Sequence, residues 1–175
     1  FSFGEFRELY TSVFPAANPA QAFREYLTAG GMPYLANLRY AREPCRQYLE
    51  ALYDSVVLKD IVKRNNVRDV DLLERIIAYI TANVGTPFSA TSITKFFKSD
   101  CLDAYLFYRV KRQDLQGKQI LTTNEKYYIA DHGIREAVFG GNMRDINLIL
   151  ENVVFMELLR REYTVTVGKS AEREV

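Results

Sequence analysis

The sequence NEKYYIADHGIREAVFGGN (residues 124–142), followed by ILENVVFMELLRREYTVTVGK (residues 149–169), decides the fold of the last third of the chain. The first stretch predicts a strand, a short helix and a Gly-Gly turn, in that order. The second predicts a helix with apolar side chains on most of its faces, which is normally buried against a sheet. The alternating TVTV pattern predicts a strand, and EREV predicts the beginning of another. We therefore expect the chain from Asn147 onward to form the first fragment of an α/β unit.

Helical periodicity recurs along the first two thirds of the chain. We expect helices over residues 1–10, 19–30, 44–64, 71–85 and 89–97, then a hairpin over 112–121 and a strand over 125–131. Asp71 and Glu74 form a capping-box-like start for the fourth helix. Helices followed by a hairpin are the order of a winged-helix domain, which we place at residues 69–133. The interval from Phe97 to Leu115 is short for the third helix of such a domain.

Composition and charge set limits on the class of protein. The chain has 175 residues, of which 48% are hydrophobic and 26% charged, so a folded globular protein is expected. The net charge of +1 gives no overall attraction to nucleic acid or membrane. However, seven basic and four acidic residues lie between positions 95 and 126. This local excess predicts either a solvated surface or a DNA-binding face that uses Lys95, Lys98, Arg109, Lys111, Arg112 and Lys118.

Several kinds of site are not expected from the sequence. Cys45 and Cys101 are far apart and His132 is the single histidine, so no zinc site is predicted. The cysteine usage favours a reducing cytoplasm, and neither a signal peptide nor a membrane-spanning run is recognisable. The chain lacks the phosphate-binding pattern GxxxxGK[ST]. Residues 168–170 spell GKS, but a strand precedes them and no glycine stands five positions upstream, so a turn is expected there.

Two residues are candidates for chemistry. His132, within Asp131-His132-Gly133, has no evident nucleophile partner, and we expect a polar turn there. Glu151 interrupts the apolar helix, and a buried carboxylate needs a partner or a cation. One interpretation is an ion pair with Arg160 or Arg161. The other is a carboxylate of a metal-dependent nuclease, which would need further acids such as Glu172 or Glu174. The ion pair is the favoured interpretation.

Four segments carry a resemblance to a known family. They are GGMPYL (residues 30–35), LYDSVVLKDIVKRNNVRD (52–69), KYYIADHGIREAVFG (126–140) and LENVVFMELLRREYTVTVGK (150–169). Together they cover most of the chain and resemble the prokaryotic AAA-type ATP-binding proteins whose C-terminal half is a domain of unknown function. Any one of the four segments alone would be a weak match.

The resemblance implies a layout. Residues 1–68 would be a helical lid and linker helix, residues 69–133 a winged-helix domain, and residues 134–175 the start of a restriction-endonuclease-like domain. The expected fold class is therefore mainly α with α+β parts. The ATPase core would precede Phe1, and Glu151 would correspond to an acidic position of the nuclease-like domain. The resemblance also implies that extra residues belong where Asp100 meets Cys101.

Three hypotheses about function follow. In the first, the chain is the non-catalytic C-terminal portion of a AAA-type ATPase and couples ATP binding and hydrolysis by its own N-terminal core to DNA. ATP and magnesium are then implied for the full-length protein, and no cofactor is expected in this chain. In the second, the chain is a stand-alone winged-helix DNA-binding regulator. In the third, it is a scaffold for a protein partner or for a second copy of itself.

Overall fold

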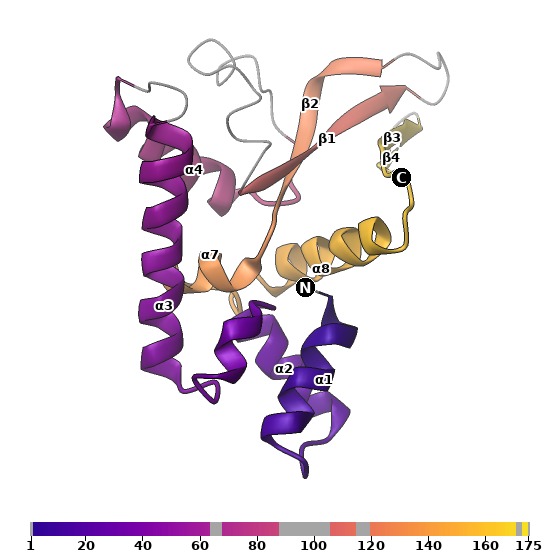
Figure 1. The fold of residues 1–175 in the computed structure, drawn as a ribbon. Coiled ribbons are helices and arrows are strands. Elements are labelled where there is room, and N and C mark those ends of the chain that lie inside the picture. Colours follow the sequence, from indigo (N-terminus) through magenta and orange to yellow (C-terminus); the bar gives the residue numbers. More distant parts are fainter. Residues whose placement is uncertain (1, 64–67, 88–105, 115–119, 171–172, 175) are drawn as a thin grey trace.

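The structure is a computed structural model, and it describes residues 2–63, 68–87, 106–114, 120–170 and 173–174. Figure 1 shows α1 and α2 in the lower part, the strands β1 and β2 above, and α7 and α8 between them. The elements are α1 (Phe3–Val13), α2 (Pro19–Ala29), η1 (Pro33–Ala36), α3 (Arg42–Asp54), η2 (Ser55–Lys63), α4 (Val70–Ala82), β1 (Phe107–Asp114), β2 (Ile120–Ile129), α7 (His132–Val138), α8 (Ile146–Arg160), β3 (Val167–Ser170) and β4 (Arg173–Glu174).

The first two predicted helices are present with shifted ends. α1 begins two residues and ends three residues after the predicted range of 1–10, whereas α2 begins at Pro19 as predicted and ends at Ala29. Ser2 and Glu5 form a reciprocal capping box at the start of α1. Asn18 and Gln21 do the same for α2, with Pro19 in its first turn. Gly30 ends α2 with a positive φ of 79°, a conformation that a glycine adopts without strain. Aromatic rings of these two helices and of the following loop then pack on one another.

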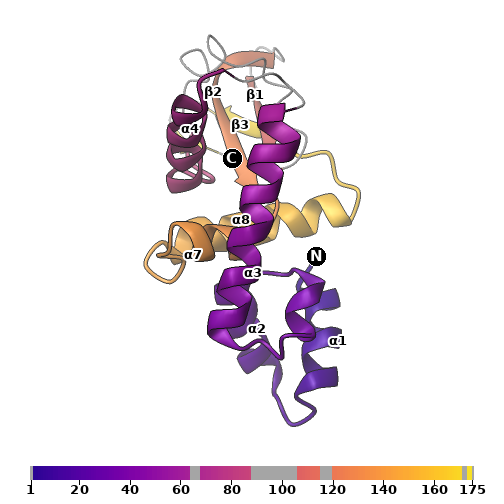
Figure 2. The same ribbon diagram turned by 60° about the vertical axis from the view of Figure 1, so that its left-hand side comes forward.

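The long helix predicted over residues 44–64 is present, but it changes from an α-helix to a π-helix along its length. It starts as α3 at Arg42 and continues from Ser55 to Lys63 as the π-helix η2. Figure 2 shows α3 running past α7 toward the sheet. The predicted capping box of the next helix is wrong, because Asp69 caps α4 instead. Its carboxylate accepts a hydrogen bond from Leu72 N at 2.9 Å, so α4 already begins at Val70.

The sheet has the strand order β2-β1-β3-β4. The predicted hairpin is confirmed, since β1 and β2 are antiparallel and pair from Phe107–Ile129 to Gln113–Ile120. It is longer than predicted: β1 begins at Phe107, and residues 125–129 continue β2 rather than forming a separate strand. The turn predicted at GKS is also wrong, because residues 168–170 belong to β3, which runs parallel to β1. The predicted last strand is present as β4.

The main hydrophobic core joins parts of the chain that are far apart in sequence. It extends from Leu35 through α3, η2 and α4 to β1, β2 and Ile134 on α7. It therefore crosses both boundaries predicted at residues 68 and 133, and those boundaries stay a prediction. The mainly helical class with a small β part is confirmed. The helix predicted over residues 89–97 lies outside the described residues. The third helix of the predicted winged helix was expected between Phe97 and Leu115, and of that interval residues 107–114 form strand β1.

Helix α8 is only half buried, contrary to the predicted burial on most faces. Ile149, Asn152 and Phe155 are its buried residues, and Phe155 stacks on Tyr128 of β2 with ring centroids 4.0 Å apart. By contrast, Val154 is 58% exposed and Leu150 is 36% exposed. Over the residues that the structure covers, no helix has the length and apolar character needed to cross a bilayer.

Candidate functional site

Glu151 lies where α8 crosses β2. Its Oε1 atom accepts a hydrogen bond from Tyr128 Oη at 2.7 Å and pairs with Lys126 Nζ at 3.0 Å. Lys126 and Tyr128 are two positions apart on β2, so both side chains point to the same face of the sheet. Gly85 closes the third side, since a Cβ atom there would lie 3.3 Å from the Glu151 carboxyl carbon. The Glu151 side chain nevertheless stays 41% exposed, whereas that of Lys126 is 11% exposed.

Asn152, next to Glu151, fixes the helix on the strand. Its Oδ1 atom accepts a hydrogen bond from Ile129 N at 2.8 Å, and its Nδ2 atom donates one to Ile129 O at 3.0 Å. The amide thus satisfies both polar main-chain groups of one β2 residue, as a neighbouring strand would. Asn152 is fully buried. The Glu-Asn pair therefore has two roles, since Asn152 docks the helix and Glu151 faces outward.

The predicted partners of Glu151 are wrong. Arg160 and Arg161 both bind Glu157, one helical turn away, and they lower the pKa of Glu157 to about 2. The ion pair expected for Glu151 is present, but Lys126 supplies it.

The further acids predicted for a nuclease site are not brought to Glu151. Glu172 lies outside the described residues, and Glu174 is described only as backbone of β4. Within the described ranges no group of three or more His, Cys, Asp or Glu side chains could hold a metal ion. A metal or nuclease role for Glu151 stays a prediction.

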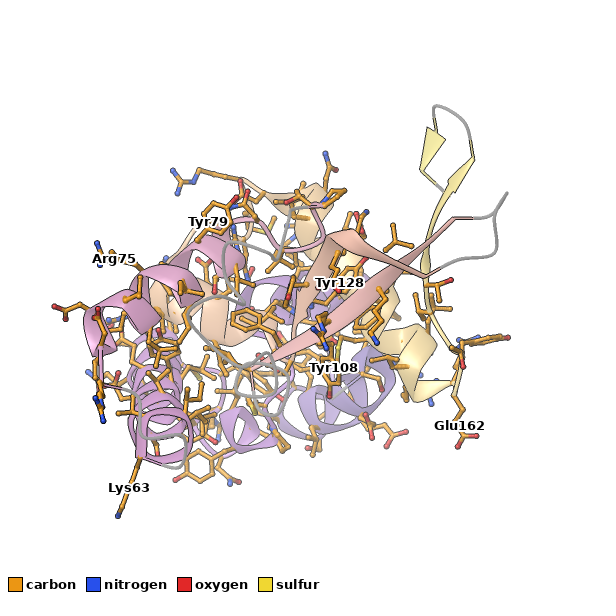
Figure 3. All side chains as sticks on the ribbon, turned by 90° about the horizontal axis from the view of Figure 1, so that it is seen from above. Lys63, Arg75, Tyr79, Tyr108, Tyr128 and Glu162 are labelled. Carbon is orange, nitrogen blue, oxygen red and sulfur yellow. The ribbon has the colours of Figure 1, made fainter. Side chains whose placement is uncertain are left out.

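Two of the predicted DNA-contacting side chains are described, and both are on β1. Arg109 pairs across the hairpin with Tyr127, which lies in the main core, whereas Tyr108 pairs with Tyr128 on the face that carries Glu151. Figure 3 shows Tyr108 and Tyr128 together on the hairpin. Arg109 is therefore on the sheet face opposite Glu151. Lys111 is exposed and sits where the hairpin register shifts.

The remaining basic candidates cannot be assigned to either face. Lys95, Lys98 and Lys118 lie outside the described residues, as does Cys101, and Arg112 is described only as backbone. Cys45 is described and is a buried free thiol of the main core.

A second polar cluster, which we call the α7 junction, joins α2 to α7. Asp131 caps α7 by accepting a hydrogen bond from Gly133 N at 2.8 Å, and its other oxygen accepts one from Gly31 N at 2.8 Å. The end of α2 and the start of α7 approach so closely that a Cβ atom on Gly133 would lie 2.1 Å from Ala29 O. The Gly-Gly and Asp-His-Gly motifs, 100 residues apart, thus fit each other.

His132 is a buried part of the same junction. Its Nε2 atom is 2.6 Å from Tyr26 O, and its ring packs edge-on against the Tyr26 ring. Burial lowers the pKa of His132, while the neighbouring Asp131 carboxylate opposes that effect. The predicted polar turn is in fact the first turn of α7. His132 therefore has a structural role: its neutral imidazole donates the Nε2–H group to the main-chain carbonyl of Tyr26.

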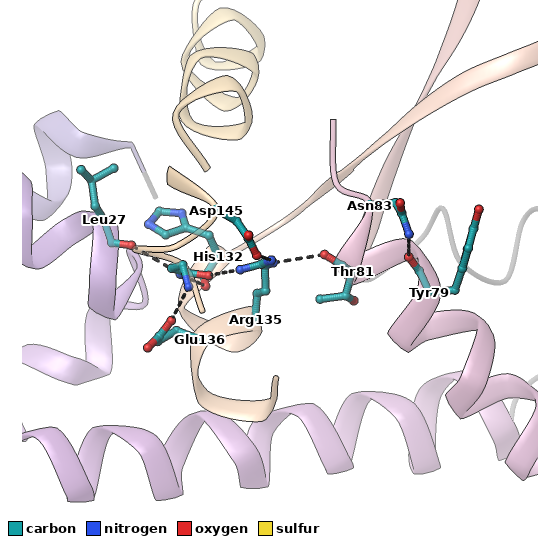
Figure 4. Close-up of polar contacts among 9 residues, drawn as sticks. Leu27, Tyr79, Thr81, Asn83, His132, Arg135, Glu136 and Asp145 are labelled. Atoms are coloured by element: carbon teal, nitrogen blue, oxygen red, sulfur yellow. Dashed lines mark hydrogen bonds and ion pairs between the residues drawn. The ribbon is translucent and has the colours of Figure 1, made fainter. Parts of the chain in front are cut away.

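Arg135 extends the junction to α4 and α8. Its guanidinium donates to Thr81 O at 3.1 Å and to Asn142 Oδ1 at 2.8 Å, and it binds Asp145 just before α8 (Figure 4). Asn142 in turn donates to His132 O at 2.8 Å and to Leu27 O at 3.4 Å. Sequence reasoning missed Arg135, Asn142 and Asn152. The sequence features that could have indicated them are the glycines that precede Arg135 and Asn142 and the apolar helix that contains Asn152.

Comparison with known proteins places the chain in a family. An uncharacterized protein of Haemophilus influenzae (strain ATCC 51907 / DSM 11121 / KW20 / Rd) is 37% identical over 171 residues. That match covers 87% of this chain and 42% of the relative, so the chain spans less than half the relative's length. No solved structure matches significantly. Residues 20–145 match the family described as a domain of unknown function, DUF8612. This match covers most of the chain, which therefore belongs to the DUF8612 family.

Proposed function

We propose that this chain is the non-catalytic coupling part of a larger AAA-type ATP-binding protein. In this proposal, an ATPase core elsewhere in the protein binds and hydrolyses ATP with magnesium, and residues 1–68 act as its lid. The chain then transmits the movement of the lid to DNA bound at the β1–β2 hairpin. The α7 junction is the observation that supports this proposal best.

The α7 junction can transmit movement because it is rigid and continuous. Asp131 and His132 hold the C-terminal end of α2, and Arg135 holds α4 and Asp145. All of these contacts except the one at Asp145 are buried, so water cannot replace these hydrogen bonds when α2 moves relative to α7. The hairpin strand β2 runs directly into Asp131. A displacement of α2 is therefore passed to β2 and α8 rather than absorbed by a loop.

The hairpin is the proposed DNA-binding element. Lys111 is exposed on β1, and Arg109 is partly exposed on the same strand. Two cations on a projecting hairpin match the way proteins contact phosphates along a DNA backbone. The length of the Haemophilus influenzae relative supports the rest of the proposal, because 58% of that protein lies outside the match and leaves room for another domain.

The test is ATP hydrolysis by the full-length protein, with and without duplex DNA, beside the 175-residue chain. We expect turnover that DNA stimulates in the full-length protein and no turnover in the chain alone. DNA binding by the chain without ATP turnover in the full-length protein would favour the stand-alone regulator. Absence of both activities would contradict the proposal.

A matched pair of variants tests the DNA-binding surface. Arg109→Glu combined with Lys111→Glu should weaken DNA binding by the chain at least about tenfold and reduce the slope of log affinity against log salt by about 2. Arg75→Glu is the control, since Arg75 is exposed on α4 and lies apart from the hairpin residues Tyr108 and Tyr128 (Figure 3). An equal loss of binding in both variants would show that Arg109 and Lys111 have no special role.

A further inference from the structure

An open groove lies between α1, α2 and the C-terminal half of α8. Its volume is ≈ 630 Å³, and its floor is largely apolar, with Phe3 and Phe23 on one side and Leu158 on the other. Figure 1 shows α1 lying beneath α8. Val154 and Tyr163 line the same groove and are 58% and 59% exposed. Sites for small molecules usually enclose their ligand, so this open shape suits a longer segment.

The groove continues along α8 as an apolar track. Leu150, Val154 and Leu158 are spaced at intervals of four residues, so they lie above one another on one face of the helix. The track is about 12 Å long, since each helical residue rises about 1.5 Å. Leu150 and Val154 are exposed along this track, on a helix whose other face already packs on the sheet. A helix that is apolar on both faces is normally covered on both.

The rim of the groove carries an excess of positive charge. Arg7, Arg160 and Arg161 line it, and Glu157 is the acidic residue among the described lining residues. Glu157 is shared by Arg160 and Arg161. The Glu5 carboxylate also attracts the Arg160 guanidinium electrostatically. It accepts its hydrogen bonds from Ser2 N and Ser2 Oγ, each at 2.9 Å, and not from Arg160. The rim therefore favours an acidic ligand.

We propose that this groove and track bind an acidic amphipathic helix of a partner protein. Apolar side chains at every third or fourth position of that helix would enter between α1 and α8 and pack along Val154 and Leu158. Its carboxylates would face Arg7, Arg160 and Arg161. This is the helix-in-groove mode of recognition, with apolar anchors for affinity and charges for orientation. The proposal depends on neither ATP nor DNA, so it is independent of the proposed function.

The probe is a fluorescein-labelled peptide of about 18 residues, long enough to form a helix, with Leu on one face and Glu on the other. Its binding to the 175-residue chain is measured by fluorescence anisotropy beside a counterpart that has Lys in place of Glu. We expect the acidic peptide to bind and the basic one not to bind. Val154→Glu, and separately Arg160→Glu with Arg161→Glu, should each weaken binding at least about tenfold. Arg75→Glu should leave binding unchanged.

Three outcomes would overturn the proposal. The acidic peptide fails to bind, or both peptides bind equally well, or the groove variants bind as tightly as the parent while circular dichroism shows all of them folded. Light scattering, which measures the mass of the chain in solution, tests whether a second copy of the chain occupies the groove instead. If the chain alone is a dimer and Val154→Glu makes it a monomer, a second copy fills the groove and the partner helix is excluded.

Discussion

The α7 junction and the contact between β2 and α8 use the same kind of residues with different results. At the junction, Asp131, His132, Arg135 and Asn142 are each no more than 4% exposed. Most of their partners are main-chain groups, among them carbonyls of α2 and α4. At the second contact Glu151 is bound by two side chains but remains 41% exposed. A closed network fixes the fold, whereas an open one leaves a carboxylate that a ligand can still reach.

The difference is energetic as well as geometric. A buried polar group that loses its partner costs about 1–3 kcal/mol, because no water replaces the lost hydrogen bond. An exposed group that loses its partner is hydrated instead and costs little. Substitutions should therefore separate the two regions, with large losses of stability at the α7 junction and small ones at Glu151.

Gly133→Ala should have the largest effect on the junction. The added Cβ atom would lie 2.1 Å from Ala29 O and 2.7 Å from Ala29 C, and neither main-chain atom can move without displacing the end of α2. We expect the free energy of unfolding in urea to fall by more than about 3 kcal/mol. Gly4→Ala is the control, since its nearest atom is Ser2 Oγ at 3.8 Å and alanine favours a helix. Equal stability of both variants would show that the close approach is not required.

Arg135→Ala should be the next most damaging change. It removes the donors for Thr81 O and Asn142 Oδ1 and leaves Asp145 without its ion-pair partner. We expect a loss of about 3 kcal/mol, measured by thermal or urea unfolding, because the guanidinium is buried and paired. Arg160→Ala removes an arginine that is 50% exposed and should leave the unfolding midpoint unchanged. Similar losses in both variants would refute the contrast between the buried and open sites.

Neighbouring residues on α8 allow a sharper comparison. Asn152→Ala leaves the N–H and C=O groups of Ile129 without their partners, so we expect a loss of about 2 kcal/mol. Glu151→Gln keeps a hydrogen-bond acceptor for Tyr128 in a half-exposed position and should cost less than about 1 kcal/mol. Unfolding in urea measures both. If Glu151→Gln is the more damaging variant, the carboxylate is structural and our view of it as available is wrong.

The sequence predicts those parts of the fold that depend on neighbouring residues. The limits of α2 were predicted closely from Pro19 and Gly30, whose effects act within one turn of a helix. The hairpin was also predicted, but β3 begins only at Val167, the last residue of the alternating TVTV segment. The start of α4 was misplaced because Asp69 and Asp71 both suit an N-cap, and only the structure shows which carboxylate reaches a free N–H group.

The candidate site was harder to predict, because it depends on contacts between distant segments. Glu151 stands out in the sequence as an acid in an apolar helix, but its partner Lys126 is 25 residues away on another element. The pairing of Gly31 with Asp131 spans 100 residues, and nothing local to either residue announces it. Patterns of helix and strand carry no such information, since they record which face a residue occupies but not what it meets there.

The pH dependence of stability gives the smallest and most specific comparison. Burial lowers the pKa of His132 below its usual 6.5, so the folded state favours the neutral ring. Above pH 6.5 the ring is neutral in both states and its contribution to stability is complete. As the pH falls through 6.5 toward the lower folded pKa, the unfolded chain binds a proton first, and stability decreases by at most about 1.4 kcal/mol per pH unit.

His132→Gln isolates this effect, because the amide can still donate to Tyr26 O while Asp131 and Arg135 remain in place. Urea unfolding of both proteins between pH 7.5 and 5 would be compared by the slope of stability against pH, since the substitution also changes the absolute value. We expect the parent to lose stability faster than the variant below pH 6.5. Parallel slopes would mean that the ring takes up its proton without leaving the α7 junction. The junction would then be open to water like the site at Glu151, and the two regions would no longer differ in kind.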